Sequence, residues 1–296
     1  MSFSLDLYRI FLAVAQNGSF SAAAGVLYIT QPAVSQAISQ LERELGVKLF
    51  IRTGRGAALT GEGEVLRGYI EGALGTIQRA ENHFSELSTL AAGTLKIGAS
   101  DTLCRHYLLP YLNTFHSCYP TIQITVTNRT SSETVALLNE NKIDLGFVNL
   151  PTPAQPNISV KELVAVQDCF VCGERYFSKF TGPVGFDYLS GFPILMLEQL
   201  SSTRRYLDEF FKWNNIDLPV QIELGSLDLL LEFAAAGLGI AAVTKEYASE
   251  YLASGKLHVI ELLTPIPHRS VGMIYQRNVP LSVAAKEFLK LIEAEI

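Results

Sequence analysis

The sequence predicts an α/β protein with a small helical head at the N-terminus, one long helix, and a two-lobed body of strands and helices. Residues 7–45 hold three short amphipathic segments with helical spacing. Residues 61–89 keep a single helical pattern. From residue 95 onward, strand-like and helix-like segments alternate in an order that indicates mostly parallel sheets.

The composition is that of a globular protein, with 48% apolar residues in a chain of 296. The formal charge of −6 indicates neither a nucleic-acid nor a membrane partner, although residues 1–60 are slightly basic. No apolar run approaches the roughly 20 residues of a membrane span, and the N-terminus lacks a signal-peptide pattern. We therefore expect a cytoplasmic protein with reduced cysteines. We interpret Cys169 and Cys172 as buried structural thiols on opposite faces of a strand, rather than as a redox or metal pair.

The head is predicted to contain three helices. The first ends at Asn17–Gly18, and its apolar stripe is Leu7, Ile10, Phe11 and Val14. The second lies in residues 19–27, with Ser21 as its N-cap. The third has Thr30 as a cap and Pro32 in its first turn, and its inward stripe is Val34, Ile38, Leu41 and Leu45. Two short helices joined by a tight turn form a helix-turn-helix, which presents its second helix outward.

The outward side of the third helix carries uncharged hydrogen-bonding groups. Its residues are Gln31, Pro32, Ser35, Gln36 and Ser39. Gln can pair with the edge of adenine, and a face without acids can approach a groove lined by phosphates, so this face suits the major groove of DNA. A solvated polar surface is the alternative interpretation.

The next segment, residues 47–60, is predicted to form a small hairpin, or wing. Glycines flank Arg55, which together with Arg52 would reach a phosphate backbone or a minor groove. Arg43 and Lys48 are further candidates for phosphate contacts. Ordinary surface charge is the alternative for all four.

The long helix over residues 61–89 has apolar positions that alternate steps of four and three. They are Leu66, Ile70, Ala73, Ile77, Ala80, Phe84 and Leu87. This 3.5-residue period is typical of a coiled-coil seam, so we expect dimerisation through it. The alternative is that the same stripe packs onto the chain's own body.

The body is predicted to contain two lobes of similar make. The expected strands are 95–100, 122–128 and 144–149 in the first lobe, and 192–198, 220–225 and 239–243 in the second. A last strand at 270–277 and a last helix at 282–295 could belong to either lobe. In such sheets, ligands bind at the C-terminal ends of the strands.

Hydroxyl and amide side chains follow these strands or open the next helix. They are Ser100, Thr102, Asn149, Ser201, Ser202 and Thr203. Helix N-termini with nearby hydroxyls bind carboxylate, sulfate or phosphate, which favours an anion site in a cleft, with simple N-capping as the alternative. No catalytic motif and no compact metal-ligand spacing is recognisable, so we expect no enzymatic activity, no cofactor and no metal.

Residues 11–64 resemble the LysR-type transcriptional regulators; they read FLAVAQNGSFSAAAGVLYITQPAVSQAISQLERELGVKLFIRTGRGAALTGEGE. Later segments, LKIGAS, DLGFVN and AAAGLGIAAVTKE, are similar to the family's effector-binding domain, so the resemblance spans nearly the whole chain. It implies a winged helix-turn-helix at 1–60, a linker and dimerisation helix at 61–90, and at 91–296 an effector-binding domain like the periplasmic binding proteins. Lobe I of that domain would comprise about 94–164 and 268–296, and lobe II about 165–267.

The resemblance implies a transcriptional regulator that binds promoter DNA as an oligomer, usually a tetramer, and responds to a small metabolite in the inter-lobe cleft. The hydroxyls and helix N-termini described above favour a small anion as this metabolite, with an aromatic acid as the alternative. By family position, the residues that meet bases would be Gln31, Pro32, Ser35 and Gln36, and Arg55 would enter the minor groove. The effector site would be lined by Ser100, Thr102, Asn149, Ser202 and Thr203. Position 36 is often Arg in the family, so Gln36 implies a different operator contact.

Two other functional classes stay open at this stage. One is a solute-binding protein with an added helical head, against which the missing signal peptide counts. The other is an enzyme with its active site in the cleft, which would need an acid/base or nucleophile set that the sequence does not show. Salt-sensitive retention of DNA would separate the regulator from both.

Overall fold

The computed structural model describes residues 4–53, 56–87 and 93–294, without the side chains of residues 52–53, 78–80 and 82–87. The chain divides into two compact units, Met1–Asn82 and His83–Ile296. The first unit holds the head and most of the long helix, and the second is the two-lobed body.

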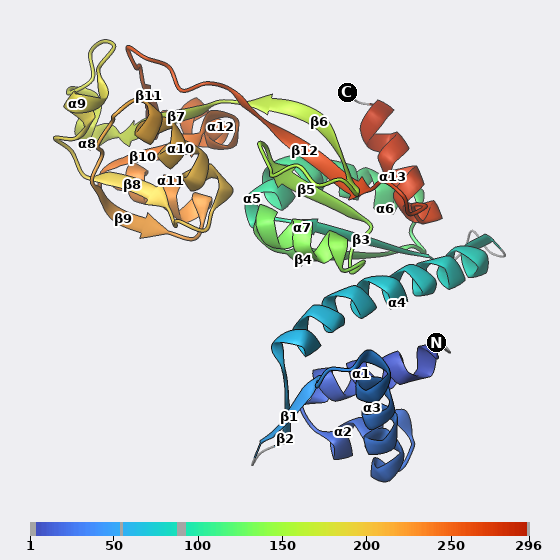
Figure 1. Cartoon of the computed structure of the whole chain (residues 1–296). Helices are drawn as coiled ribbons and strands as arrows, with labels where there is room; N and C mark the ends of the chain where they lie inside the picture. The colour runs from blue at the N-terminus through green and yellow to red at the C-terminus, as the bar shows by residue number, and fades with distance from the viewer. Residues whose placement is uncertain (1–3, 54–55, 88–92, 295–296) are drawn as a thin grey trace. The chain divides into compact units, whose positions relative to one another are not determined.

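The head consists of three helices followed by a hairpin (Figure 1). The helices are α1 (Leu5–Asn17), α2 (Phe20–Leu27) and α3 (Gln31–Leu45), and the strands are β1 (Phe50–Thr53) and β2 (Gly56–Leu59). β1 and β2 pair antiparallel. One apolar core, which includes the fully buried Phe11, Val14, Val34 and Leu41, holds these elements together. The predicted helix-turn-helix and wing are therefore both present.

Capping residues set where the head's helices begin and end. α1 stops at Gly18, whose φ of 62° lies in the left-handed region that glycine adopts without strain. Thr30 caps α3, as predicted. The predicted cap at Ser21 is wrong, because the turn at Gly18 leaves Ser19 extended directly before α2, and Ser19 accepts the N–H of Ala22.

The long helix α4 (Gly61–Leu87) follows β2.

One residue of the apolar stripe predicted for α3 is not buried: Leu45 is 40% exposed. It is the last residue of α3, where Gly46 ends the helix with a φ of 73°, so no further turn covers it. The remaining members of that stripe, Val34, Ile38 and Leu41, are buried as predicted.

Lobe I is a five-stranded sheet in the order β4-β3-β5-β12-β6, with helices on both faces. Its strands are β3 (Thr94–Ala99), β4 (Gln123–Asn128), β5 (Leu145–Asn149), β6 (Ile158–Val166) and β12 (Arg269–Gln276). β3, β4 and β5 are parallel, and β12 pairs antiparallel with β5 and β6. Helices α6 (Leu109–Cys118) and α13 (Val283–Ala294) pack on one face and α7 (Ser131–Asn139) on the other. The last strand and helix thus belong to lobe I.

Lobe II is a second five-stranded sheet, in the order β11-β7-β10-β8-β9. Its strands are β7 (Asp168–Gly173), β8 (Ile194–Leu197), β9 (Val220–Leu224), β10 (Ile240–Thr244) and β11 (Leu257–Ile260). β8, β9 and β10 are parallel, whereas β7 is antiparallel to β10 and β11. Helices α10 (Ser202–Trp213) and α11 (Leu227–Ala235) bury their apolar residues in two different core clusters, so they cover opposite faces. Short helices are α5 (Asp101–Leu103), α8 (Glu174–Phe177), α9 (Phe186–Leu189) and α12 (Ser249–Ala253).

The two cysteines of the C-x-x-C both lie in β7 and are buried. Cys169 belongs to the core cluster beneath α11, and Cys172 to the one beneath α10. Burial raises the pKa of the Cys169 thiol to about 12 and that of Cys172 to about 11. Both are neutral structural thiols on opposite faces of the strand, as predicted.

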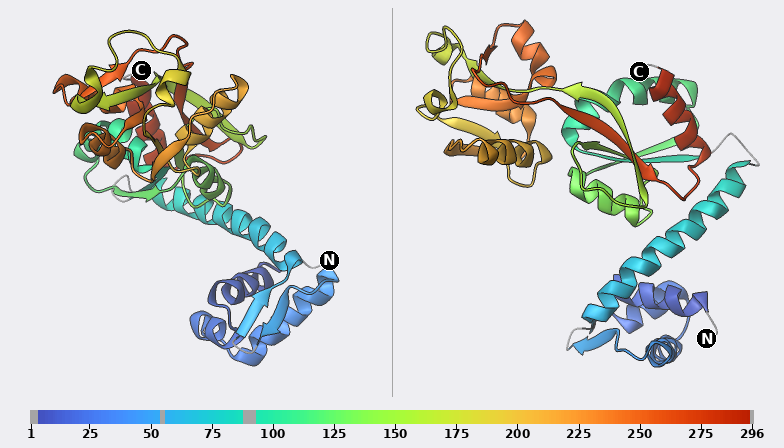
Figure 2. Two further views of the ribbon diagram at one scale, coloured as in Figure 1. Left: turned by 90° about the vertical axis from the view of Figure 1, so that its left-hand side faces the viewer. Right: turned by 45° about the horizontal axis from the view of Figure 1, so that its top comes forward.

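Two connections link the lobes. The chain leaves lobe I after Val166, enters lobe II at Asp168, and returns to lobe I at Arg269. Figures 1 and 2 show β6 and β12 side by side, leading from one lobe to the other. The expected lobe boundaries, near 165 and 268, lie next to these crossings. Within the described residues, no helix is both long and apolar enough to cross a membrane.

Candidate DNA-binding surface and inter-lobe cleft

The outward face of α3 is uncharged and open to solvent. Gln31, Pro32, Gln36 and Ser39 are exposed and Ser35 is half-buried. The side-chain amide of Gln31 donates to Ser35 Oγ at 2.8 Å, so these two side chains lie along the helix together. Because the opposite side of α3 is packed in the head core, only this face is free to enter a groove.

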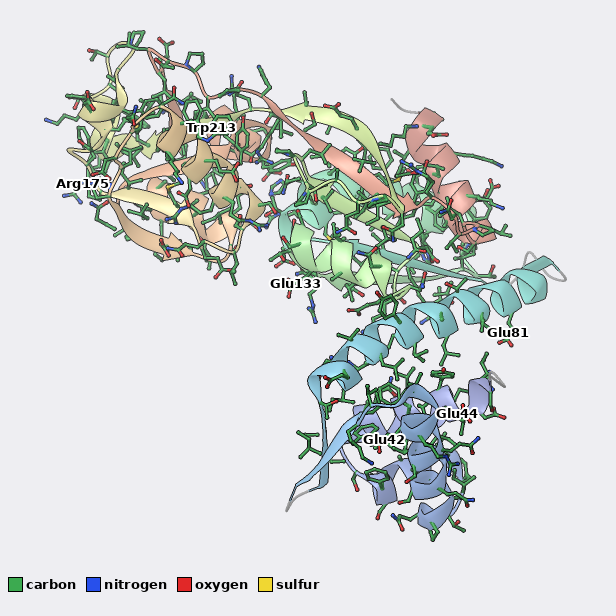
Figure 3. All side chains as sticks on the ribbon, in the orientation of Figure 1. Glu42, Glu44, Glu81, Glu133, Arg175 and Trp213 are labelled. Atoms are coloured by element: carbon green, nitrogen blue, oxygen red, sulfur yellow. The ribbon has the colours of Figure 1, made fainter. Side chains whose placement is uncertain are left out.

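Glu42, near the end of α3, is an anchor that the sequence did not identify (Figure 3). Its carboxylate accepts hydrogen bonds from Lys48 Nζ at 2.6 Å and from the backbone N–H of Leu49 at 2.9 Å, with a longer one from Phe50 at 3.4 Å. Burial alone would raise the pKa of this carboxyl, but the three hydrogen bonds and the charge of Lys48 outweigh it and the pKa is lowered. Glu42 thereby fixes the start of the wing against α3 and holds Lys48, a predicted phosphate contact.

The wing is tied to the turn between α1 and α2. The backbone N–H of Ala57 donates to Gly18 O at 2.8 Å. At Gly56, a Cβ atom would lie 2.2 Å from that same carbonyl oxygen, so only glycine permits this approach. Of the other predicted phosphate contacts, Arg43 is exposed, whereas Arg55 and the side chain of Arg52 lie outside the described residues.

The predicted dimerisation seam divides into parts with different surroundings. Leu66 and Ile70 pack against the core of the head in the same chain, together with Leu74. Ala73 is exposed and Ile77 is half-buried. The side chains of Ala80, Phe84 and Leu87 lie outside the described set. Contact with a second chain through Ala73, Ile77 and the following positions stays a prediction, while Leu66 and Ile70 contribute to the head itself.

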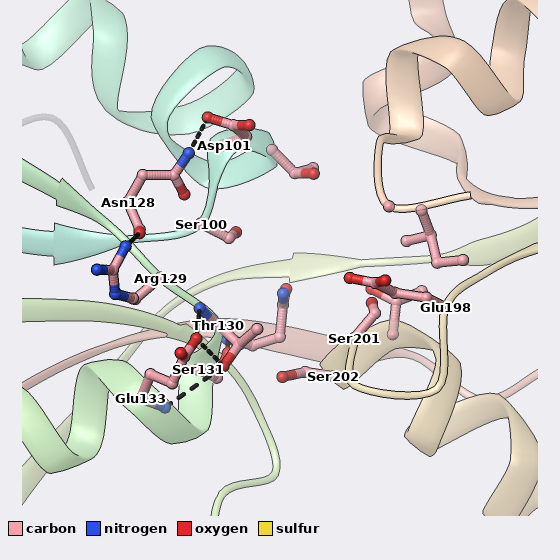
Figure 4. A pocket seen from close by; sticks show the side chains of 15 residues that line it. Ser100, Asp101, Asn128, Arg129, Thr130, Ser131, Glu133, Glu198, Ser201 and Ser202 are labelled. Carbon is pink, nitrogen blue, oxygen red and sulfur yellow. Dashed lines mark hydrogen bonds between the residues drawn. The ribbon is translucent and has the colours of Figure 1, made fainter. Parts of the chain in front are cut away.

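In the body, a cavity of about 310 Å³ opens between the two lobes. All five residues that the sequence assigned to an effector site line it: Ser100, Thr102, Asn149, Ser202 and Thr203. In Figure 4, Ser100, Asn128 and Thr130 of lobe I face Glu198, Ser201 and Ser202 of lobe II. These residues converge because the C-terminal ends of β3, β4, β5 and β8 all point toward the same gap.

Hydrogen bonds within the chain already use the oxygen atoms of several lining side chains. Ser131 Oγ accepts the backbone N–H of Asn149 at 3.1 Å, and Ser100 Oγ accepts that of Leu103 at 3.4 Å. Ser202 Oγ lies 3.5 Å from Arg205 Nη2, which donates to it. The hydroxyl hydrogens of these serines have no acceptor among the described residues, so they are available to a ligand in the cavity.

The charged groups of the cavity wall are mostly engaged locally. Glu133 forms a capping box with Thr130, and the hydrogen bonds from the Thr130 hydroxyl and backbone lower the pKa of its carboxyl. Asp101 accepts a short hydrogen bond from Asn128, and Arg129 donates to the Asn128 carbonyl at 2.7 Å. Glu198 is exposed, and its carboxylate has no hydrogen-bond partner in the described part of the chain. One acidic group is thus free to meet a ligand.

A buried ion pair lies next to the cavity and contacts two of its lining residues, and no pattern in the sequence predicted it. Arg269 and Asp168 have side chains that are 1% and 0% exposed, and Arg269 Nε lies 2.5 Å from Asp168 Oδ2. The guanidinium also donates to Asn149, Thr203 and Thr244. Arg269 lies in an ordinary-looking PHRSVG segment, and its burial depends on Asp168, which is 101 positions away in the sequence. No group of three His, Cys, Asp or Glu among the described residues could hold a metal ion.

Comparison with known sequences matches both units. Residues 5–64 match the model of bacterial regulatory helix-turn-helix proteins of the lysR family, and residues 88–296 match the LysR substrate binding domain. A probable RuBisCO transcriptional regulator from Nostoc sp. is 29% identical over 293 residues, which cover 97% of this chain and 87% of that protein.

Solved structures share the fold along the chain. Full-length CbnR complexed with its target DNA has a TM-score of 0.66 at 19% identity, covering 99% of this chain and 100% of that one. Full-length LysG from Corynebacterium glutamicum, with the effector Arg bound, has a TM-score of 0.69 at 20% identity, covering 99% and 98%. At such identities the likeness shows the fold alone. Because the two family models together match nearly the whole chain, the protein belongs to the LysR family and is a DNA-binding transcriptional regulator, not an enzyme.

Proposed function

We propose that this regulator reads promoter DNA with the outward face of α3 and with its wing. We further propose that it binds the DNA as an oligomer, a dimer that assembles into a tetramer. We place the protein in the cytoplasm, together with the DNA that it binds. Its effector is a small molecule with an anionic group, bound in the cleft between the lobes. The observation that carries the DNA-binding part is the exposed, uncharged face of α3.

Base reading is supported by the chemistry of that face. The amides of Gln31 and Gln36 can donate and accept in one plane, as the edge of adenine requires. Ser35 and Ser39 can contact several bases. Phosphate attraction falls to Arg43 and to the wing, because Lys48 is already held by Glu42.

Oligomerisation is supported by how little positive charge one head supplies. Affinity for DNA rises with the number of phosphates that Lys and Arg neutralise. Joining heads makes each further contact intramolecular and raises the total affinity without new contacts. Ala73 and Ile77 lie on α4 outside the group of residues that packs on the head core, and they offer the surface for a second chain.

An anionic group in the cleft is supported by the donors that face it. The hydroxyl groups of Ser100, Ser131 and Ser202 are available there, and the N-terminus of α10 at Ser202 has no side-chain cap among the described residues. Glu198 adds a requirement: a ligand that fills the cleft would also carry a hydrogen-bond donor or a positive group on that side. Two proteins of the same fold have been solved with the kinds of partner proposed here: LysG with its effector Arg, and CbnR with its target DNA.

The DNA-binding part is tested with sheared genomic DNA from the source organism. Fragments retained by the full chain are sequenced, and the best one is footprinted at two salt concentrations. We expect a few promoters with an imperfect two-fold repeat and weaker binding at higher salt. Retention of no specific fragment, with or without cell metabolites present, would overturn the proposal.

A matched pair of variants assigns the binding to α3. Gln36→Glu places a carboxylate on the face that meets bases and phosphates, so we expect retention to fall by at least about tenfold. Gln199→Glu makes the same change at an exposed position of the body and should bind as the unmodified protein does. Equal losses in both variants would mean that net charge, and not this face, controls binding.

A further inference from the structure

The pair Arg269–Asp168 lies at the two points where the chain has crossed between the lobes and a new strand begins. Asp168 is the first residue of β7 and Arg269 the first of β12. The contact is bidentate, with Nε to Oδ2 at 2.5 Å and Nη2 to Oδ1 at 2.9 Å. Thr244 closes the arrangement by donating to Asp168 Oδ1 at 2.9 Å. Such a pair holds the guanidinium plane in one orientation.

The same guanidinium reaches a lining residue from each lobe. Nη1 donates to Asn149 Oδ1 at 2.7 Å, and Nη2 donates to Thr203 Oγ1 at 3.0 Å. Asn149 ends β5 of lobe I, and Thr203 lies in the first turn of α10 of lobe II. A guanidinium has donors and no acceptor, so both oxygens must act as acceptors in these contacts.

The two hydrogen bonds from Arg269 determine the direction in which Asn149 and Thr203 present their own hydrogen atoms. With Oδ1 of Asn149 held by Arg269, the amide group Nδ2 is the end left for the cavity. Asn149 is only 9% exposed, lines the 310 Å³ cavity and an adjoining one of about 150 Å³, and finds no acceptor for Nδ2 among the described residues. The hydroxyl hydrogen of Thr203 is likewise left as a donor. Both donors lie on residues that line the cavity, so a ligand that supplies an acceptor oxygen there can bind to them.

We propose that Arg269 is the positioning residue of the effector cleft: it holds Asn149 and Thr203 as paired donors, and the group they select is an oxyanion. The acceptor is a carboxylate, sulfate or phosphate oxygen placed between the two lobes. This inference rests on the proposed function only in taking the cleft as the effector site. Arg269 acts through its neighbours and does not touch the ligand.

Substitutions of nearly equal shape separate donor direction from packing. Asn149→Asp keeps the oxygen that Arg269 holds but replaces the NH₂ donor by a second, negative oxygen. Thr203→Val removes the hydroxyl at nearly constant volume, and Thr203→Ser restores it. Binding of sulfate, inorganic phosphate and acetate to the full-length protein is measured by titration calorimetry, and these three probes show which oxyanion fits.

The wild-type chain is expected to bind at least one of the three probes. Asn149→Asp should weaken that binding by at least about tenfold and Thr203→Val by about threefold to tenfold, whereas Thr203→Ser should restore it. Equal binding by the wild type and Asn149→Asp would overturn the inference. So would a failure of the wild type to bind any probe, even if it retains specific promoters, in which case the proposed DNA-binding function stands alone. If the wild type binds a probe as expected but retains no specific promoter, the inference about the cleft stands and the proposed DNA-binding function fails.

The role of Arg269 itself is tested by a cycle of substitutions. Because Arg269 acts through Asn149, the losses caused by Arg269→Met and Asn149→Asp should not add in the double variant. Arg269→Lys retains a cation and should recover part of the binding. Arg277→Met, the same change at an exposed arginine just beyond β12, is the control and should leave probe binding unchanged. Additive losses would show that Arg269 does not act through Asn149, and if Arg269→Met does not fold, the Asn149 and Thr203 variants still decide the question.

Discussion

Glu42 of the head and Asp168 of the body are both buried carboxylates that pair with a cation, and they are held in different ways. Glu42 of the head accepts hydrogen bonds from residues within eight positions of it, and its charged partner Lys48 is 79% exposed. Asp168 of the body is fully buried, and its partner Arg269 is 101 positions away and almost as deeply buried. The head is therefore organised by local contacts, whereas the cleft depends on contacts that only the complete fold creates.

The functional surfaces differ in the same way. The outward face of α3 comes from residues between 31 and 39, so one helix suffices to arrange it. The cleft takes Ser100, Asn149 and Thr203 from two lobes and positions two of them with Arg269. However, the cleft is complete in one chain, whereas a single head offers few cations to DNA.

The largest expected effect is on the stability of the body. Asp168→Ala removes one partner of the buried pair and leaves the charge of Arg269 without compensation, so the free energy of unfolding should fall by about 3–5 kcal/mol. Denaturant unfolding of the full chain, followed by circular dichroism, measures it. Asp217→Ala, at an exposed position of the same lobe, is the control. A loss below about 1 kcal/mol would mean that the pair is weakly coupled to folding.

The pair also marks the limit of what the sequence could predict. The face of α3 was predictable because helical periodicity assigns inward and outward residues directly. Ser100, Asn149 and Ser202 were predictable as lining residues because strand ends converge in parallel sheets. Arg269 and Asp168 were not, since the burial of a charge depends on a partner that no local pattern indicates. Ser21 and Leu45 failed for a smaller reason: the exact end of a helix is set by backbone turns at Gly18 and Gly46.

The second effect concerns the number of heads on one DNA. Ile77 lies in the predicted seam and is half-buried in the single chain. Ile77→Asp should prevent association of the helices, and operator affinity should fall by about a hundredfold because the linked heads are lost. Sedimentation equilibrium and a gel-shift titration measure the two quantities. Thr76→Asp, an exposed neighbour on the same helix, should retain both. Unchanged affinity in a monomeric Ile77→Asp protein would contradict the requirement for several heads.

The smallest effect is on the head, where the buried carboxylate is held locally. The pKa of Glu42 is lower in the folded chain than its ordinary value of 4.5. Its charged form is thus favoured by folding, and this contribution is present above pH 4.5 and is lost as the pH falls through the lowered pKa.

Glu42→Gln should cost the head about 1–2 kcal/mol at pH 7, because it weakens the contacts with Lys48 and Leu49, and it should remove this part of the acid dependence. Thermal unfolding of both proteins between pH 3 and pH 7 measures the difference. Glu44→Gln, at an exposed position two residues further along α3, serves as the control. Since Lys48 is largely in water, the effect should stay below that of Asp168→Ala. If Glu42→Gln proved the more damaging change, local contacts in the head would outweigh the buried pair of the body, and the contrast between the two units would be reversed.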